Sequence, residues 1–132
     1  MKIYRRILTV LVCLTLVLGL ALTGFAAAGA PFFSMPAGGK MVTGSGTISK
    51  TEATATLTSK NIPFEPIQPD FAYSCHVWID AYNQSGKRYA GADMEGTVSA
   101  YTSCRLEYYT SYVEYTYDFL NYRFGPHELK YS

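Results

Sequence analysis

Residues 71–82, FAYSCHVWIDAY, are the stretch of sequence that decides the fold. Apolar residues and Cys75 occupy every second position, while His76, Trp78 and Asp80 occupy the positions between them. Alternation with a period of two is typical of a β-strand that buries one of its faces. We therefore predict a strand here, with Cys75 in the core, followed by a turn at residues 83–86, where Gly86 can adopt a positive φ.

The same alternation recurs on both sides of this strand. Residues 47–58 place small apolar residues on one face and threonines on the other. Residues 96–106 place Cys104 on an apolar face, and residues 108–124 alternate valine and tyrosine with polar residues. No segment after residue 28 shows helical spacing over three turns. The predicted fold is all-β, a small antiparallel β-sandwich of six to eight strands within residues 47–132.

Two other segments contain many residues that interrupt strands. Residues 29–46 are rich in Gly, Ala, Pro and Ser, and we predict that they form a flexible spacer. Residues 61–70 contain prolines at a spacing of three, which favours an extended connection whose apolar side chains can pack over a sheet edge.

The first 28 residues have the pattern of a secretory signal peptide. Three basic residues precede an uncharged apolar stretch at 7–22, and small residues end the segment at Ala26 and Ala28. We expect a signal-peptide helix, cleavage after Ala28, and a secreted or cell-surface protein. The alternative is an uncleaved membrane anchor, because residues 7–28 are long enough to cross a bilayer.

Charge excludes one class of partner. The chain has 11 Lys and Arg against 10 Asp and Glu, and three of the basic residues lie in the leader, so residues 29–132 have a formal net charge of −2. No basic patch remains there to contact phosphate groups, and we expect no nucleic-acid partner. We expect membrane contact only through the leader.

The leader would also remove Cys13, which leaves Cys75 and Cys104. An even number of cysteines in an exported domain predicts a disulfide, and both residues lie on expected core faces. The alternatives are two unpaired structural thiols or, less favoured, a catalytic or metal-binding thiol. The spacing of the cysteines matches no zinc motif, and we expect no metal and no cofactor.

Two groups of residues are candidates for binding. His76, Trp78 and Asp80 share the polar face of residues 71–82, where they would form a ligand site, a general-base pair or an ordinary solvent-facing row. Tyrosines are concentrated in the last third of the chain, and their rings and hydroxyls suit a recognition surface as well as a core. The tyrosines chosen as binding candidates are Tyr108, Tyr109 and Tyr112.

No catalytic motif is present, so an enzyme is not expected. The sequence therefore favours an exported, non-catalytic β-sandwich that acts as a binding or structural module at or near a bacterial cell surface, with a protein or glycan partner. The alternatives are a small secreted toxin or bacteriocin-like effector and, less favoured, a small hydrolase.

Overall fold

The computed structural model describes residues 30–67 and 69–131, which form eight β-strands and one short 3₁₀ helix. The predicted leader, its helix and its cleavage site lie outside the described residues. The described residues contain no helix that is long and apolar enough to cross a membrane. The elements in chain order are β1 (Phe33–Ala37), β2 (Lys40–Ile48), β3 (Glu52–Asn61), η1 (Asp70–Ala72), β4 (Cys75–Asn83), β5 (Arg88–Gly96), β6 (Ser99–Arg105), β7 (Thr110–Phe119) and β8 (Tyr122–Lys130).

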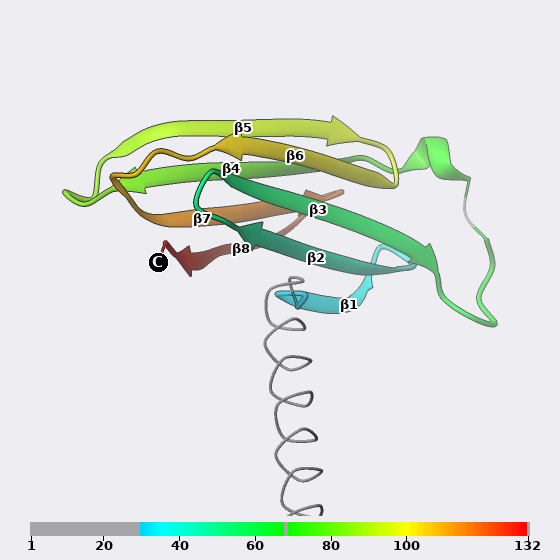
Figure 1. The fold of residues 1–132 in the computed structure, drawn as a ribbon. Coiled ribbons are helices and arrows are strands. Elements are labelled where there is room, and N and C mark those ends of the chain that lie inside the picture. The colour runs from blue at the N-terminus through cyan, green and yellow to red at the C-terminus, as the bar shows by residue number, and fades with distance from the viewer. Residues whose placement is uncertain (1–29, 68, 132) are drawn as a thin grey trace, which may run out of the picture. The chain divides into compact units, whose positions relative to one another are not determined.

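The strands form two antiparallel sheets that face each other (Figure 1). One sheet has the order β1-β2-β3-β6 and the other has the order β5-β4-β7-β8. The chain crosses between the sheets after β3, β5 and β6. The predicted small antiparallel β-sandwich is thus confirmed. The segment Pro31–Ser132 is a compact unit with its own hydrophobic core.

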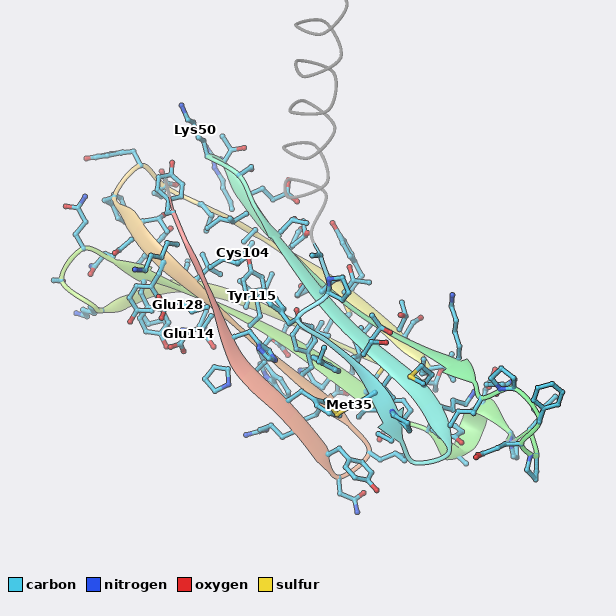
Figure 2. All side chains as sticks on the ribbon, turned by 90° about the horizontal axis from the view of Figure 1, so that it is seen from below. Met35, Lys50, Cys104, Glu114, Tyr115 and Glu128 are labelled. Atoms are coloured by element: carbon cyan, nitrogen blue, oxygen red, sulfur yellow. The ribbon has the colours of Figure 1, made fainter. Side chains whose placement is uncertain are left out.

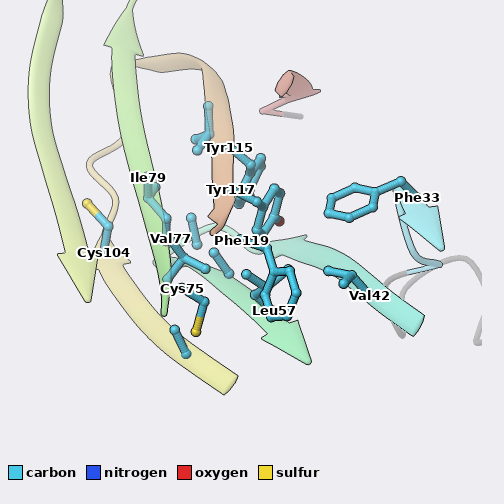
Figure 3. Close-up of a cluster of buried hydrophobic side chains, with 14 of the residues drawn as sticks. Phe33, Val42, Leu57, Cys75, Val77, Ile79, Cys104, Tyr115, Tyr117 and Phe119 are labelled. Carbon is cyan, nitrogen blue, oxygen red and sulfur yellow. The ribbon is translucent and has the colours of Figure 1, made fainter. Parts of the chain in front are cut away.

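The core is built from residues that alternate along β2, β3, β4 and β7 (Figure 3). Tyr115 and Tyr117 are the largest of its fully buried side chains. Their rings span the space between the sheets, and their hydroxyls donate hydrogen bonds to the Thr47 carbonyl (2.7 Å) and the Ser45 carbonyl (2.6 Å) of β2. Burial raises the pKa of both phenols. Each tyrosine therefore fills the core with its ring and satisfies its polar end on the opposite sheet.

The prediction that residues 29–46 form a flexible spacer is wrong. Residues 33–37 and 40–48 are strands β1 and β2. The inward-facing Gly44 lies under an aromatic ring, because a Cβ there would be 2.2 Å from Cε1 of Phe33. A Cβ at Gly46 would be 2.8 Å from Cε1 of Tyr115. These glycines give the rings room in a dense core, whereas composition alone favours flexibility.

The predicted disulfide is also wrong, although both cysteines are buried as expected, with 4% of Cys75 and 6% of Cys104 exposed. Cys75 begins β4 beside Gly96, and Gly96 contacts Ser99 at the start of β6. Cys104 lies five residues further along β6, a separation of about 16 Å along a strand. A disulfide needs Cα atoms about 4.4–6.8 Å apart. Figure 3 shows the two thiols well separated in the core, where burial raises the pKa of each.

The connection between β3 and β4 does not cover a sheet edge as expected. Phe64 and Ile67 are exposed in the loop that extends beyond the strands (Figure 1).

Candidate functional site

The outer face of the β5-β4-β7-β8 sheet brings together the first group of predicted site residues. His76, Trp78 and Asp80 are half-buried and alternate with the buried core residues of β4. The His76 ring stacks on the Trp78 ring, with centroids 3.8 Å apart and planes 10° apart. The two rings therefore occupy fixed positions on this face.

His76 also contacts two carboxylates from the neighbouring strand β5. Its Nε2 lies 2.7 Å from Oδ2 of Asp93, and its Nδ1 lies 3.2 Å from Oε1 of Glu95. The sheet register places Glu95 opposite His76 and Asp93 opposite Trp78. Asp93 and Glu95 were not assigned to this group from the sequence, because their place beside His76 depends on the register between two strands.

The partner of Asp80 is not His76, which its spacing along the strand suggested. Its Oδ1 accepts a hydrogen bond from Nε of Arg88 at 2.5 Å, and this contact raises the pKa of Arg88. His76 and Asp80 thus bind separate groups and do not form the general-base pair considered from the sequence.

Arg123 of β8 completes the row on the other side of Trp78. Its guanidinium donates two hydrogen bonds to Asp118, at 2.7 and 2.9 Å, in the bidentate geometry that fixes an arginine most firmly. The same guanidinium lies 5.3 Å from the centroid of the Trp78 ring, within the range of a cation–π contact. Trp78 is therefore packed against both His76 and Arg123.

The predicted tyrosine face is divided between two regions. Tyr112 lies on the same outer face, where it stacks on Tyr82 with ring centroids 4.7 Å apart. The Tyr82 hydroxyl donates a hydrogen bond to Oε2 of Glu114 at 3.3 Å, and burial together with this carboxylate raises the pKa of Tyr82. Tyr108 and Tyr109 lie in the turn between β6 and β7, with ring centroids 5.3 Å apart in an edge contact.

A small depression opens beside His76, with a volume of about 250 Å³. Its lining includes Ser74, His76, Glu95 and Asp118, whose side chains can form hydrogen bonds with a ligand. Within residues 30–67 and 69–131, no group of three or more His, Cys, Asp or Glu side chains has a metal-binding arrangement.

We call this surface the outer aromatic face. It consists of His76, Trp78, Asp80, Tyr82, Arg88, Asp93, Glu95, Tyr112, Glu114, Asp118 and Arg123.

Comparisons of the chain with protein-family models, curated proteins and solved structures give no match. Since one sandwich fold serves many functions, the function is inferred from the side chains of the outer aromatic face.

Proposed function

We propose that this protein is an exported, non-catalytic binding module that acts at or near a bacterial cell surface and uses the outer aromatic face to recognise a glycan or a protein. The observation that carries this proposal is the ordered row formed by Arg123, Trp78 and His76 beside the depression at His76, Glu95 and Asp118. The leader pattern supports export.

Preorganisation supports a binding role. The aromatic rings of the face are stacked, and its carboxylates are held by Arg88, Arg123 and His76. A ligand that binds such groups pays little additional entropy to immobilise them. The polar edges of the rings and the free lone pairs of the carboxylates stay available to hydroxyl and amino groups, which glycans and polar protein surfaces supply.

The charge on this face favours the same ligand classes. Carboxylates outnumber guanidinium groups there, so a phosphate backbone would be repelled. A neutral or amino-bearing glycan, or a protein with exposed basic residues, would be complementary.

The test is a glycan array and a pull-down from cell-surface extracts with residues 31–132. We expect captured ligands to lose at least about tenfold in affinity when His76→Ala or Glu95→Ala is introduced, which corresponds to about 1.4 kcal/mol. Thr56→Ala is the matched control, because Thr56 lies on the outer side of the other sheet. Binding that is unchanged in both face variants would contradict the proposed site.

The same purified segment separates the alternatives from the sequence. Killing or permeabilisation of neighbouring cells would favour a toxin. Hydrolytic activity that is lost when His76→Ala is introduced would favour an enzyme.

A further inference from the structure

The outer surface of the β1-β2-β3-β6 sheet presents a regular array of hydroxyl groups. On its two central strands, the outward-facing positions within residues 43–47 and 54–58 are all serine or threonine, and they alternate with buried residues. Strands β2 and β3 run side by side, with Lys50 in the turn that joins them (Figure 2). We call the six residues the hydroxyl ladder: Thr43, Ser45, Thr47, Thr54, Thr56 and Thr58.

The strand register makes the ladder a two-dimensional lattice. Paired side chains on neighbouring strands are about 4.5–5.5 Å apart, and successive pairs along the strands are about 6.4–6.8 Å apart. The flanking strands extend the same rows with Ser34 of β1 and with Ser99, Tyr101 and Ser103 of β6. The three pairs of the ladder are Thr43–Thr58, Ser45–Thr56 and Thr47–Thr54.

Contacts on both sides of β2 hold the lattice in place. From the core, the Tyr115 and Tyr117 hydroxyls donate to the carbonyls of Thr47 and Ser45, which ties this strand to the opposite sheet. On the outer side, the Thr47 and Thr54 hydroxyls share a hydrogen bond across the strands. The branched Cβ of threonine also restricts χ1. A partner that binds these hydroxyls therefore loses little free energy in ordering them.

Charge separates this surface from the rest of the molecule. The six residues of the ladder are all uncharged, and the charged residues of β3 that share its outer side, Glu52 and Lys60, lie at the two ends of the strand. The outer aromatic face of the other sheet, in contrast, carries carboxylates and guanidinium groups along its whole row.

Strand propensity explains only part of this composition. Threonine favours strands, but a solvent-facing sheet of a soluble domain normally carries interspersed charges of both signs. An uncharged partner is complementary to the ladder, whereas an ionic partner would lose hydration there without meeting a counter-charge.

The weakness of single hydroxyl contacts indicates a rigid partner. Each hydroxyl can both donate and accept hydrogen bonds, yet each bond contributes only about 0.5–1.5 kcal/mol, because liquid water competes for the same groups. A flexible partner that reaches one or two hydroxyls gains little. A rigid partner with a repeat of its own can engage all six at once.

The surface of ice has these properties. It is uncharged, rigid and periodic, and its water molecules both donate and accept hydrogen bonds. The six positions of the ladder include no aromatic ring on which a sugar could stack, which favours ice over a crystalline polysaccharide. We propose that the hydroxyl ladder binds the surface of ice crystals.

The test grows ice slowly from a dilute solution of the protein, purified from cells that express the full chain. Serum albumin in the same sample is the reference that does not bind ice. The concentration of each protein is measured in the ice and in the remaining liquid. We expect this protein to be enriched in the ice, while albumin stays in the liquid.

Thr56→Lys should reduce the enrichment to the level of albumin. Thr56 lies between Ser45 and Tyr101 at the centre of the array, so a lysine there would hold the ice away from the other residues. Thr116→Lys is the matched control, because Thr116 is a half-buried, outward-facing threonine of β7 in the other sheet. This control should be enriched in the ice as the parent is.

A conservative variant guards against misfolding. The double variant Ser45→Ala/Thr56→Ala removes the central pair of hydroxyls without adding bulk or charge, and urea unfolding checks that it folds. It should also lose enrichment relative to the parent.

Three results would overturn the proposal. They are a parent chain that is excluded from ice, a folded Thr56→Lys variant that is enriched like the parent, and a double variant that is enriched like the parent. If the parent is excluded from ice and instead sediments with crystalline cellulose or chitin, the ladder binds polysaccharide and the proposal is wrong. Glycan binding by the outer aromatic face is measured separately and on the other sheet, so its failure and the failure of ice binding are distinguishable.

Discussion

Replacing Gly44 with alanine tests whether β2 is part of the core. The inward-facing Gly44 has no positive φ, so an alanine fits the backbone and only the added Cβ matters. That Cβ would lie 2.2 and 2.5 Å from Cε1 and Cζ of Phe33. An ordinary carbon–carbon contact is about 3.5–4.0 Å, so the ring has to move by more than about 1 Å.

The displaced ring has little free space to enter. Phe33 is buried, stacks on Phe124 with centroids 4.2 Å apart, and meets the Tyr117 ring at 5.4 Å in an edge contact. Overpacking of this kind costs about 1–3 kcal/mol. In a domain of this size a loss of about 2 kcal/mol lowers the Tm by roughly 8–16 °C. A flexible spacer predicts the opposite sign, because Gly→Ala in a disordered or tolerant segment is neutral or stabilises by about 0.4–1 kcal/mol.

The assay is urea unfolding of residues 31–132, followed by the fluorescence of Trp78, the one tryptophan of the chain. Gly44→Ala should shift the midpoint to lower urea without changing the slope. Ser45→Ala is the matched control, because Ser45 faces outward from the same strand and should change stability by less than about 0.5 kcal/mol. A Gly44→Ala variant as stable as the parent would refute the packing of β2 against Phe33.

Three further outcomes are expected. Burial lowers the pKa of His127 from its ordinary value of 6.5, so below about pH 6.5 the unfolded chain binds a proton that the folded chain lacks, and stability should fall as pH falls. Thermal unfolding between about pH 7 and 5 should show a smaller fall in Tm for His127→Phe than for the parent. An equal fall in Tm for the two proteins would contradict this prediction. Cys75 and Cys104 should resist iodoacetamide in the folded protein and both react in urea without reductant, whereas labelling that requires reductant would indicate a disulfide. Tyr117→Phe should lose about 1–2 kcal/mol in urea unfolding, because the Ser45 carbonyl loses its buried donor, and an unchanged midpoint would show that this hydrogen bond contributes nothing.

Strand pairing brings additional residues to the candidate site that the sequence did not reveal. The alternation of residues 71–82 placed His76 and Trp78 on one outer face, since the side-chain period of a strand is a local property. Asp93 joins His76 only because β5 pairs with β4 in one register, and Arg123 reaches Trp78 only because β8 lies beside β7. A register between strands depends on contacts between distant residues, which a single sequence does not display.

The sequence by itself determined the strand β4 and the burial of both cysteines, because alternation reports which face of a strand is apolar. It did not show that residues 108–124 belong to two strands, because the structure ends β7 at Phe119 and begins β8 at Tyr122. The tertiary structure decided how far apart two buried residues lie along the core. Cys75 and Cys104 are both buried in the core but lie at different positions along the strand direction, and they are therefore unpaired. It also decided the role of the glycines in β2. In the sequence, Gly44 suggests a flexible segment, whereas in the structure it makes room for the Phe33 ring that lies over it. Dense packing between distant segments leaves no local pattern in the sequence, so this role was not predictable.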